Sequence, residues 1–295
     1  MSAKTPKKLV SRNKNDIKTT VIIVLGVIVA VQAFLLFNKG KTHEGKPAMP
    51  AKALPVAVGG SIPMKRGAPA GSAGKIAFII DDWGYTTRNC KYLKEIKTPL
   101  AIAILPNLRH SDDAAQCAAG SGKNVMLHLP LEPYYNNDHY PDNYLITTTM
   151  KPAQVIKILE DSLNKMPLAQ GVNNHMGSKA TEDGPLMKTI FKCLKKRRLF
   201  FVDSMTSPRH SVCGGLADQM ALPFANRDVF LDNVNTKEDI AKQIAVLAQK
   251  ARKKGFAIAI GHDRELTLQV IAEQIPLLEY QGFSIVSVKD LLRNK

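Results

Sequence analysis

The chain has 295 residues, of which 45% are hydrophobic and 22% charged, so it has enough apolar residues for one sizeable core and too many for a disordered protein. Its formal net charge is +16, but residues 1–74 hold +10 of that charge and leave +6 for the other 221 residues. Because the excess lies mostly in this N-terminal part, and no known nucleic-acid-binding motif is present, the basic composition does not indicate a nucleic-acid-binding protein.

Residues 19–37 form an uncharged apolar run that, as a helix, would span roughly 28 Å, close to the thickness of the hydrocarbon layer. Residues 1–18 carry six basic residues and one acidic residue, which is typical of a cytoplasmic tail. The sequence therefore predicts a single-pass anchor in the cytoplasmic (inner) membrane, with the main domain in the periplasm or elsewhere outside the cytoplasm. A cleaved signal peptide is the alternative, because Val31, Gln32 and Ala33 fit a cleavage pattern.

Residues 38–74 are rich in Lys, Ala, Pro and Gly and lack hydrophobic periodicity, so we expect a flexible, disordered linker. Residues 75–295 then alternate short apolar runs with amphipathic segments and are expected to form one domain. The apolar runs predict strands at 75–80, 100–106, 124–129, 169–175, 199–203, 228–232, 256–262 and 283–288. The amphipathic segments predict helices at 89–96, 112–119, 152–166, 184–198, 215–221, 237–255 and 266–282, the last of them bent at Pro276.

This alternation of strands and helices requires parallel pairing with right-handed crossovers. Runs such as AIAIL (101–105) show no inside–outside alternation, which is typical of parallel strands buried on both faces. The α/β pattern predicts a distorted (β/α) barrel of about 7–8 units, with an open doubly wound sheet as the alternative.

Polar residues stand at the C-terminal ends of the predicted strands, where ligands bind in parallel α/β folds. A single aspartate there often caps the next helix, and a single histidine is often structural. Three of the seven histidines occupy such ends, however, and strand-end aspartates accompany them. The residues concerned are Asp81, Asp82, His128, His175, Asp203, Asp232 and His262.

Histidines brought together with a carboxylate suit a divalent metal of the zinc class. Adjacent residues at a strand end point in different directions, so one of Asp81 and Asp82 could bind the metal while the other takes a proton from the attacking water. A histidine on the opposite side could protonate the leaving group.

The four cysteines contain no C-x-x-C pair, which leaves a zinc finger or a thioredoxin-type motif unsupported. In an oxidising compartment we expect the pairs Cys90–Cys117 and Cys193–Cys213, with free buried thiols as the alternative. Nucleotide-binding glycine motifs and the G-x-S-x-G motif of serine hydrolases are also absent from the sequence.

Six segments together resemble the divergent polysaccharide deacetylases, which are related to the metal-dependent carbohydrate esterases. They are AFIIDDWG (77–84), LHLPLEP (127–133), GVNNHMGSKAT (171–181), FVDSMTS (201–207), RDVFLDN (227–233) and AIGHD (259–263). The resemblance implies a barrel-like fold and removal of N-acetyl groups from an envelope or cell-wall polysaccharide, of which peptidoglycan is one.

The resemblance also implies roles for residues in these segments. Asp81 corresponds to the base, Asp82 to a metal ligand and His262 to the acid. The family's H-x-x-x-H pair has Glu132 in its second position here, so His175 would supply the second imidazole of an Asp82–His128–His175 site. Glu132, Asp203 and Asp232 are then further ligands or support the ligands, and the matching segments offer Asn174, Ser178 and Arg227 for substrate binding.

The first hypothesis is therefore a metal-dependent hydrolase of the amidase type that deacetylates envelope polysaccharide, with zinc as the expected metal. The alternative is a deacetylase-like envelope protein without catalysis that binds glycan or a cell-wall enzyme partner. A metal phosphoesterase would use the same ligand types, but the predicted rim has no basic cluster to receive a phosphate.

Overall fold

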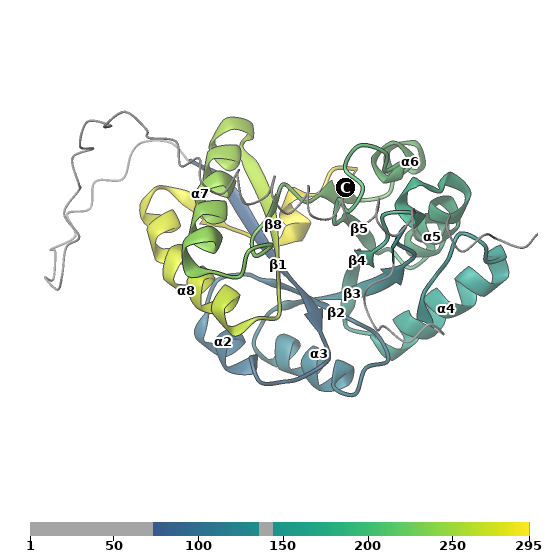
Figure 1. Ribbon diagram of the computed structural model, residues 1–295, viewed down its shortest axis with the longest axis horizontal. Coiled ribbons are helices and arrows are strands. Elements are labelled where there is room, and N and C mark those ends of the chain that lie inside the picture. Colours follow the sequence, from purple (N-terminus) through teal and green to yellow (C-terminus); the bar gives the residue numbers. More distant parts are fainter. Residues whose placement is uncertain (1–72, 136–143, 295) are drawn as a thin grey trace, which may run out of the picture. The chain divides into compact units, whose positions relative to one another are not determined.

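A curled sheet of parallel strands forms the centre of the computed structural model, which describes residues 73–135 and 144–294 (Figure 1). The strands are β1 Gly74–Trp83, β2 Ala101–Ile104, β3 Asn124–Leu131, β4 Ala169–Met176, β5 Phe200–Asp203, β6 Phe224–Asn226, β7 Val229–Phe230, β8 Phe256–His262 and β9 Phe283–Ile285. Their order is β6-β5-β4-β3-β2-β1-β8-β7, and β9 pairs with the start of β1.

Helices surround the convex side of this sheet (Figure 1). They are α2 Cys90–Glu95, α3 Ser111–Gly120, α4 Pro152–Lys165, α5 Gly184–Lys196, α6 Cys213–Met220, α7 Lys237–Lys254 and α8 Glu265–Tyr280, with the short 3-10 helices η2 Ala180–Glu182 and η3 Val288–Leu291. Local signals fix their ends, as in α7, where the Thr236 hydroxyl accepts from the Asp239 N–H at 3.2 Å and Gly255 follows the last turn with φ of 86°.

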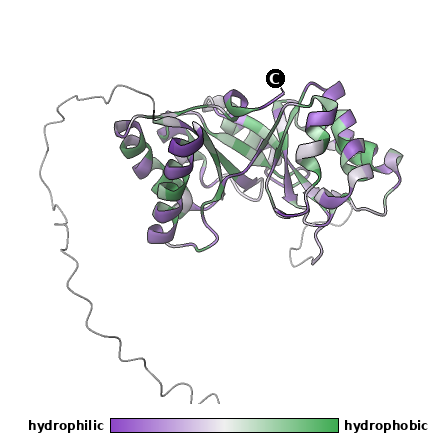
Figure 2. Ribbon diagram, turned by 90° about the horizontal axis from the view of Figure 1, so that it is seen from above, coloured by the Kyte–Doolittle hydropathy of each residue, from purple (hydrophilic) through white to green (hydrophobic). Residues whose placement is uncertain are grey.

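The two faces of the sheet pack against different partners. One large apolar cluster joins the strands to the helices, and a second, smaller cluster fills the concave side with strand residues such as Ile79 and Ala103 and the C-terminal residues Leu291 and Leu292. Figure 2 shows apolar residues concentrated in the strands and polar residues on the outer sides of the helices. One helix-covered face and one filled concave face make this a barrel-like arrangement and not a doubly wound sheet.

The sheet does not close into a barrel, because no pairing joins β6 to β7 among the described residues. The predicted distorted barrel is therefore confirmed as a barrel-like α/β fold, and its sheet is a curled, open half-barrel. The C-terminal segment lies at the open edge, where Arg293 and Phe224 of β6 exchange backbone hydrogen bonds at 2.9 and 3.1 Å. This pairing is antiparallel and covers the backbone of an otherwise exposed edge strand.

The predicted elements are otherwise found in place, with four local corrections. Strand β6 was not predicted, and the strand expected at 228–232 is only the two residues of β7. The last strand ends at Ile285, and residues expected to extend it turn into η3. Gly74, expected to end the linker, is the first residue of β1.

Within residues 73–135 and 144–294, no helix has the length and apolar character needed to cross a membrane. The predicted tail (1–18) and anchor (19–37) lie outside the described residues, as does the linker (38–74) apart from its last two residues. The expected Cys90–Cys117 disulfide is present and joins α2 to α3. The expected Cys193–Cys213 pair is wrong, because both are buried free thiols with separate partners, Glu160 and the Thr181 carbonyl.

Candidate metal and catalytic site

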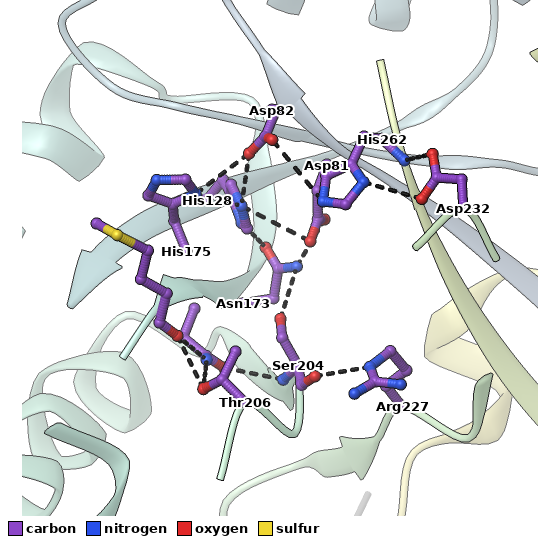
Figure 3. Close-up of polar contacts among 12 residues, drawn as sticks. Asp81, Asp82, His128, Asn173, His175, Ser204, Thr206, Arg227, Asp232 and His262 are labelled. Carbon is purple, nitrogen blue, oxygen red and sulfur yellow. Dashed lines mark hydrogen bonds and ion pairs between the residues drawn. The ribbon is translucent and has the colours of Figure 1, made fainter. Parts of the chain in front are cut away.

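Three side chains from β1, β3 and β4 meet at the C-terminal edge of the sheet (Figure 3). Asp82 Oδ1 lies 3.2 Å from His128 Nε2 and 3.2 Å from His175 Nδ1. The two imidazole nitrogens are themselves 3.2 Å apart, so the three atoms form a nearly equilateral triangle. The structure thus brings together the three residues predicted as metal ligands.

A bulge in β1 brings both carboxylates of the Asp81–Asp82 pair to this place. The pairing of β1 with β2 shifts register between Ile80 and Trp83, and Asp82 adopts the left-handed conformation with φ of 65°. Consecutive residues of a regular strand point to opposite faces, but here Asp81 Oδ2 also lies 3.6 Å from His128 Nε2. The bulge therefore brings both side chains to one site, as their predicted division into ligand and base requires.

The donor triangle fits a divalent metal ion. One carboxylate and two imidazoles form a donor set typical of zinc, and tetrahedral zinc with bonds of about 2.0–2.1 Å separates its ligand atoms by roughly 3.3 Å. The observed edges of 3.2 Å match that spacing. Asp82 Oδ1 is buried, and both imidazole nitrogens lie within ion-pair distance of it, so a single cation among the three atoms would satisfy all of them.

The surroundings of Asp81 and Asp82 shift the pKa values of these two carboxyl groups in opposite directions. Burial raises the pKa of Asp81, and the nearby His128 offsets this only in part. Burial also acts to raise the pKa of Asp82, but the His128 and His175 imidazoles outweigh it and lower that pKa far below its usual value. Asp82 therefore stays ionised, as a ligand must, while Asp81 is a stronger base than an exposed carboxylate.

A second pair, His262 and Asp232, lies beside the triangle. His262 Nδ1 donates to Asp232 Oδ1 at 2.9 Å, and its Nε2 lies 3.8 Å from Asp82 Oδ2. Thr267 also donates to Asp232, at 2.7 Å. Burial alone would lower the pKa of His262, but the hydrogen bond to Asp232 and the surrounding carboxylates raise it. His262 is thus held with Nε2 facing the site and with its protonated form favoured.

Two predicted supporting residues bind elsewhere. The Glu132 carboxylate accepts from Thr148 Oγ1 and from Lys179 Nζ, both at 2.7 Å, and it is not one of the converging metal donors. Asp203 accepts from the Met205 N–H at 2.7 Å and from the Ser211 hydroxyl at 2.6 Å. Both carboxylates therefore fix rim loops, whereas Asp232 does support a site residue, His262.

The residues predicted to bind substrate lie in the rim loops or next to them. Asn174 is buried and bonds to the Met176 carbonyl and the Ser204 N–H, both at 2.8 Å. The Ser178 hydroxyl accepts from the Tyr134 N–H at 3.1 Å. Arg227 Nε donates to the Ser204 carbonyl at 2.7 Å, and its guanidinium lies 4.7 Å from the Phe230 ring centroid. Their roles toward a substrate remain predictions.

Asn173 belongs to the site and was not among the predicted residues. It is fully buried, and its amide bonds to Asp81 Oδ1 at 2.8 Å and to His128 Nδ1 at 2.9 Å. The signal that could have found it is the two-residue period of a strand, which places Asn173 on the same side as His175 and Asn174 on the other. The register confirms this neighbourhood, because Asn173 is paired with His128.

Comparison with known proteins finds a matching family model and similar proteins. The family model described as divergent polysaccharide deacetylase matches residues 78–292. The Escherichia coli protein YibQ is 31% identical over 203 residues, which cover 69% of this chain but only 63% of that protein. A Haemophilus influenzae protein is 33% identical over 221 residues, covering 75% of this chain and 78% of its own.

A solved structure is similar in fold. The crystal structure of the Agrobacterium tumefaciens protein ATU2773 superposes with a TM-score of 0.69 at 22% identity, and the match covers 77% of this chain and 92% of that one. At this identity the likeness concerns the fold alone, so the chemistry has to be argued from the site itself.

Proposed function

The chain belongs to the divergent polysaccharide deacetylase family, and from this premise we propose that it is a metal-dependent hydrolase that removes N-acetyl groups from an envelope glycan such as peptidoglycan. The proposal is carried by three features that lie together at the C-terminal edge of the sheet. They are the triangle of metal-donor atoms, the buried aspartate with a raised pKa, and the histidine that is hydrogen-bonded to a second carboxylate. Metal-assisted amide hydrolysis uses these three parts: an electrophilic ion, a base and an acid.

Asp82, His128 and His175 would hold the ion, and zinc fits their donor set best. When bound, such an ion polarises a carbonyl oxygen and makes a water molecule acidic enough to lose a proton at neutral pH. The departure from the H-x-x-x-H pattern leaves the donor count intact, because His175 from the next strand provides the imidazole that Glu132 cannot.

Asp81 would accept the proton of the attacking water. Its Oδ1 is held by Asn173, and its burial keeps the carboxylate poorly solvated and basic. His262 would donate a proton from Nε2 to the departing amine. Because Asp81 and His262 are register partners on adjacent strands, one rigid pair of strands positions both base and acid.

We also propose that the domain works outside the cytoplasm, tethered to the inner membrane through residues 19–37. The support is the uncharged apolar run with its basic flank, together with the Cys90–Cys117 disulfide, which suits an oxidising compartment. Envelope polysaccharide would then be within reach of the site. The chain could also meet a cell-wall enzyme partner there.

Acetate release tests this function. The purified full-length chain, loaded with Zn²⁺, Co²⁺ or Ni²⁺, is incubated with peptidoglycan fragments and with chitin oligomers, and free acetate is measured. We expect release by the wild type and by the surface control His110→Ala, and none by Asp82→Ala. Metal binding without acetate release from either glycan contradicts catalysis and favours a glycan-binding or partner-binding role.

A further inference from the structure

We propose that Asn173 is the positioning residue that makes Asp81 a base and leaves metal binding to Asp82. The inference rests on the proposed function, since it assigns work within the same site. Asn173 lies on β4, is fully buried, and its side chain lies between Asp81 and His128 (Figure 3). No other residue described in the structure hydrogen-bonds to both a candidate base and a candidate metal ligand.

Elementary hydrogen-bond chemistry fixes the direction of the Asn173 amide. An ionised Asp81 carboxylate can only accept, so the NH₂ group of Asn173 must face it, at 2.8 Å. The second N–H of the same group points to the Ser204 hydroxyl at 3.3 Å. The amide oxygen then faces His128 Nδ1 at 2.9 Å, so His128 must donate through Nδ1.

This direction settles the tautomer of the neutral His128 ring, the form that binds a metal. With the proton on Nδ1, the Nε2 lone pair faces Asp82 and His175, which is the form that a metal ligand needs. Ligating histidines usually donate their other N–H to a carboxylate or a carbonyl. Here a side-chain amide takes that place, and the same amide is bonded to the base.

The bulge in β1 creates the need for such a residue. Asp81 Oδ2 lies 3.6 Å from His128 Nε2, close to the 3.2 Å of Asp82 Oδ1, so both carboxylates are near enough to compete for an ion. The Asn173 hydrogen bond holds Asp81 Oδ1 and so resists any rotation of the carboxylate that would bring Oδ2 closer to the donor triangle. A carboxylate restrained in this way remains available to accept a proton, and Asp82 alone completes the triangle.

Two substitutions test the amide oxygen and the amide NH₂ group of Asn173 separately. Asn173→Asp keeps an acceptor for His128 Nδ1 but removes the donor to Asp81. Asn173→Leu has a side chain of similar size and removes both the acceptor for His128 and the donor to Asp81. Asn124→Leu is the matched control, because Asn124 stands on the neighbouring strand β3 at the opposite end of the sheet and bonds to Gln170 and Ser287.

Three readouts are taken on the full-length chain. They are the Zn²⁺ dissociation constant from a competition titration, the imidazole ¹⁵N shifts of His128 in the metal-free protein, and kcat for acetate release at saturating Zn²⁺. We expect Asn173→Leu to weaken Zn²⁺ binding about 10–100-fold and to abolish the Nδ1–H preference of His128. We expect Asn173→Asp to retain that preference and to bind Zn²⁺ within about 3-fold of wild type, while kcat falls about 10²-fold.

The outcomes that overturn the proposal are equally distinct. One is a folded Asn173→Leu protein with wild-type Zn²⁺ affinity and kcat, and another is equal weakening of Zn²⁺ binding by Asn173→Asp and Asn173→Leu. If Asn173→Leu fails to fold, retained kcat in Asn173→Asp is decisive against it. If the wild type releases no acetate, the proposed function fails, but the Zn²⁺ affinity and the ¹⁵N shifts still test what Asn173 does to His128.

Discussion

His262 and Asp232 are joined by two hydrogen bonds, one from the ring Nδ1 to Oδ1 and one from the backbone N–H to Oδ2, both at 2.9 Å. The first sets the ring tautomer and the second fixes the carboxylate at the end of β8. Because the ionised Asp232 favours imidazolium, it raises the pKa of His262 above its usual range, against the effect of burial. His262 therefore keeps its proton to a higher pH than an exposed histidine would.

This pair predicts the alkaline side of the pH profile. A histidine acting as an acid works in its protonated form, so activity is retained below the raised pKa of His262 and falls as pH rises through it. Asp232→Asn removes the charge that raises this pKa, and we expect kcat to fall more at pH 8 than at pH 6. The measurement is kcat for acetate release across pH 5–9. An alkaline limb unchanged by Asp232→Asn would exclude His262 as the acid.

The donor triangle predicts a large loss of metal on removing one imidazole. His175→Ala leaves two protein donors, and we expect Zn²⁺ affinity to fall by more than the roughly 10–100-fold typical of losing a supporting residue. Calorimetric titration of Zn²⁺ into chelator-treated protein measures it. His110→Ala is the matched control, because His110 is on the surface and pairs with Asp113. Equal Zn²⁺ binding by both variants would place the metal elsewhere.

Asp263 predicts a pH-dependent change in stability. Burial raises the pKa of Asp263 to about 6, and the carboxylate accepts from Asn89 at 2.7 Å. A raised acid pKa favours folding at low pH, and this contribution is lost as pH rises from about 4 through 6. Asp263→Asn needs no ionisation in the folded state, so it should stabilise the metal-free protein at pH 7.5 by on the order of 1 kcal/mol, after discounting for partial exposure.

Urea unfolding at pH 4 and pH 7.5 checks this prediction. The difference between Asp263→Asn and wild type should appear at pH 7.5 and nearly vanish at pH 4. The control Asp161→Asn alters an exposed pair with Lys157 and should change little at either pH. An equal effect of Asp263→Asn at both pH values would show that hydrogen bonding, and not ionisation, decides the result.

The disulfide predicts a loss of stability on reduction. Cys90 and Cys117 are 27 residues apart, and closing a loop of that length in the unfolded chain stabilises the folded state by about 3.5 kcal/mol on chain entropy alone. A reductant should lower the wild-type free energy of unfolding by roughly this amount. The double variant Cys90→Ser, Cys117→Ser should start at the lower value and not respond to reductant. A response in the variant would implicate the buried thiols instead.

Much of the architecture could be predicted because parallel strands and amphipathic helices leave strong periodic patterns. Whether the sheet closes into a barrel could not be predicted. Closure depends on whether two short, distant segments pair, and β6 and β7 are too short to show a period. Residues 286–288 continue an apolar pattern, but the chain leaves the sheet after Ile285 and covers its concave side.

Site residues could be predicted where polar side chains stand at the C-terminal ends of predicted strands. His128, His175 and the Asp81–Asp82 pair were found in this way. The bulge and the left-handed residue that bring both carboxylates to one site were not, because they leave no signature in a single sequence. Asn173 was missed, whereas its neighbour Asn174 was predicted to bind substrate. Only the alternation of strand β4 distinguishes them, since one amide faces the site and the other the backbone of the next loop.

Anomalous diffraction from crystals soaked in Zn²⁺ tests most directly the claim that these three residues hold one catalytic metal. The account predicts a single strong peak within about 2.0–2.3 Å of Asp82 Oδ1, His128 Nε2 and His175 Nδ1, with Asp81 still bonded to Asn173 and not coordinated. A peak bound by Asp81 in place of Asp82, or the absence of a peak at this triangle, would contradict it.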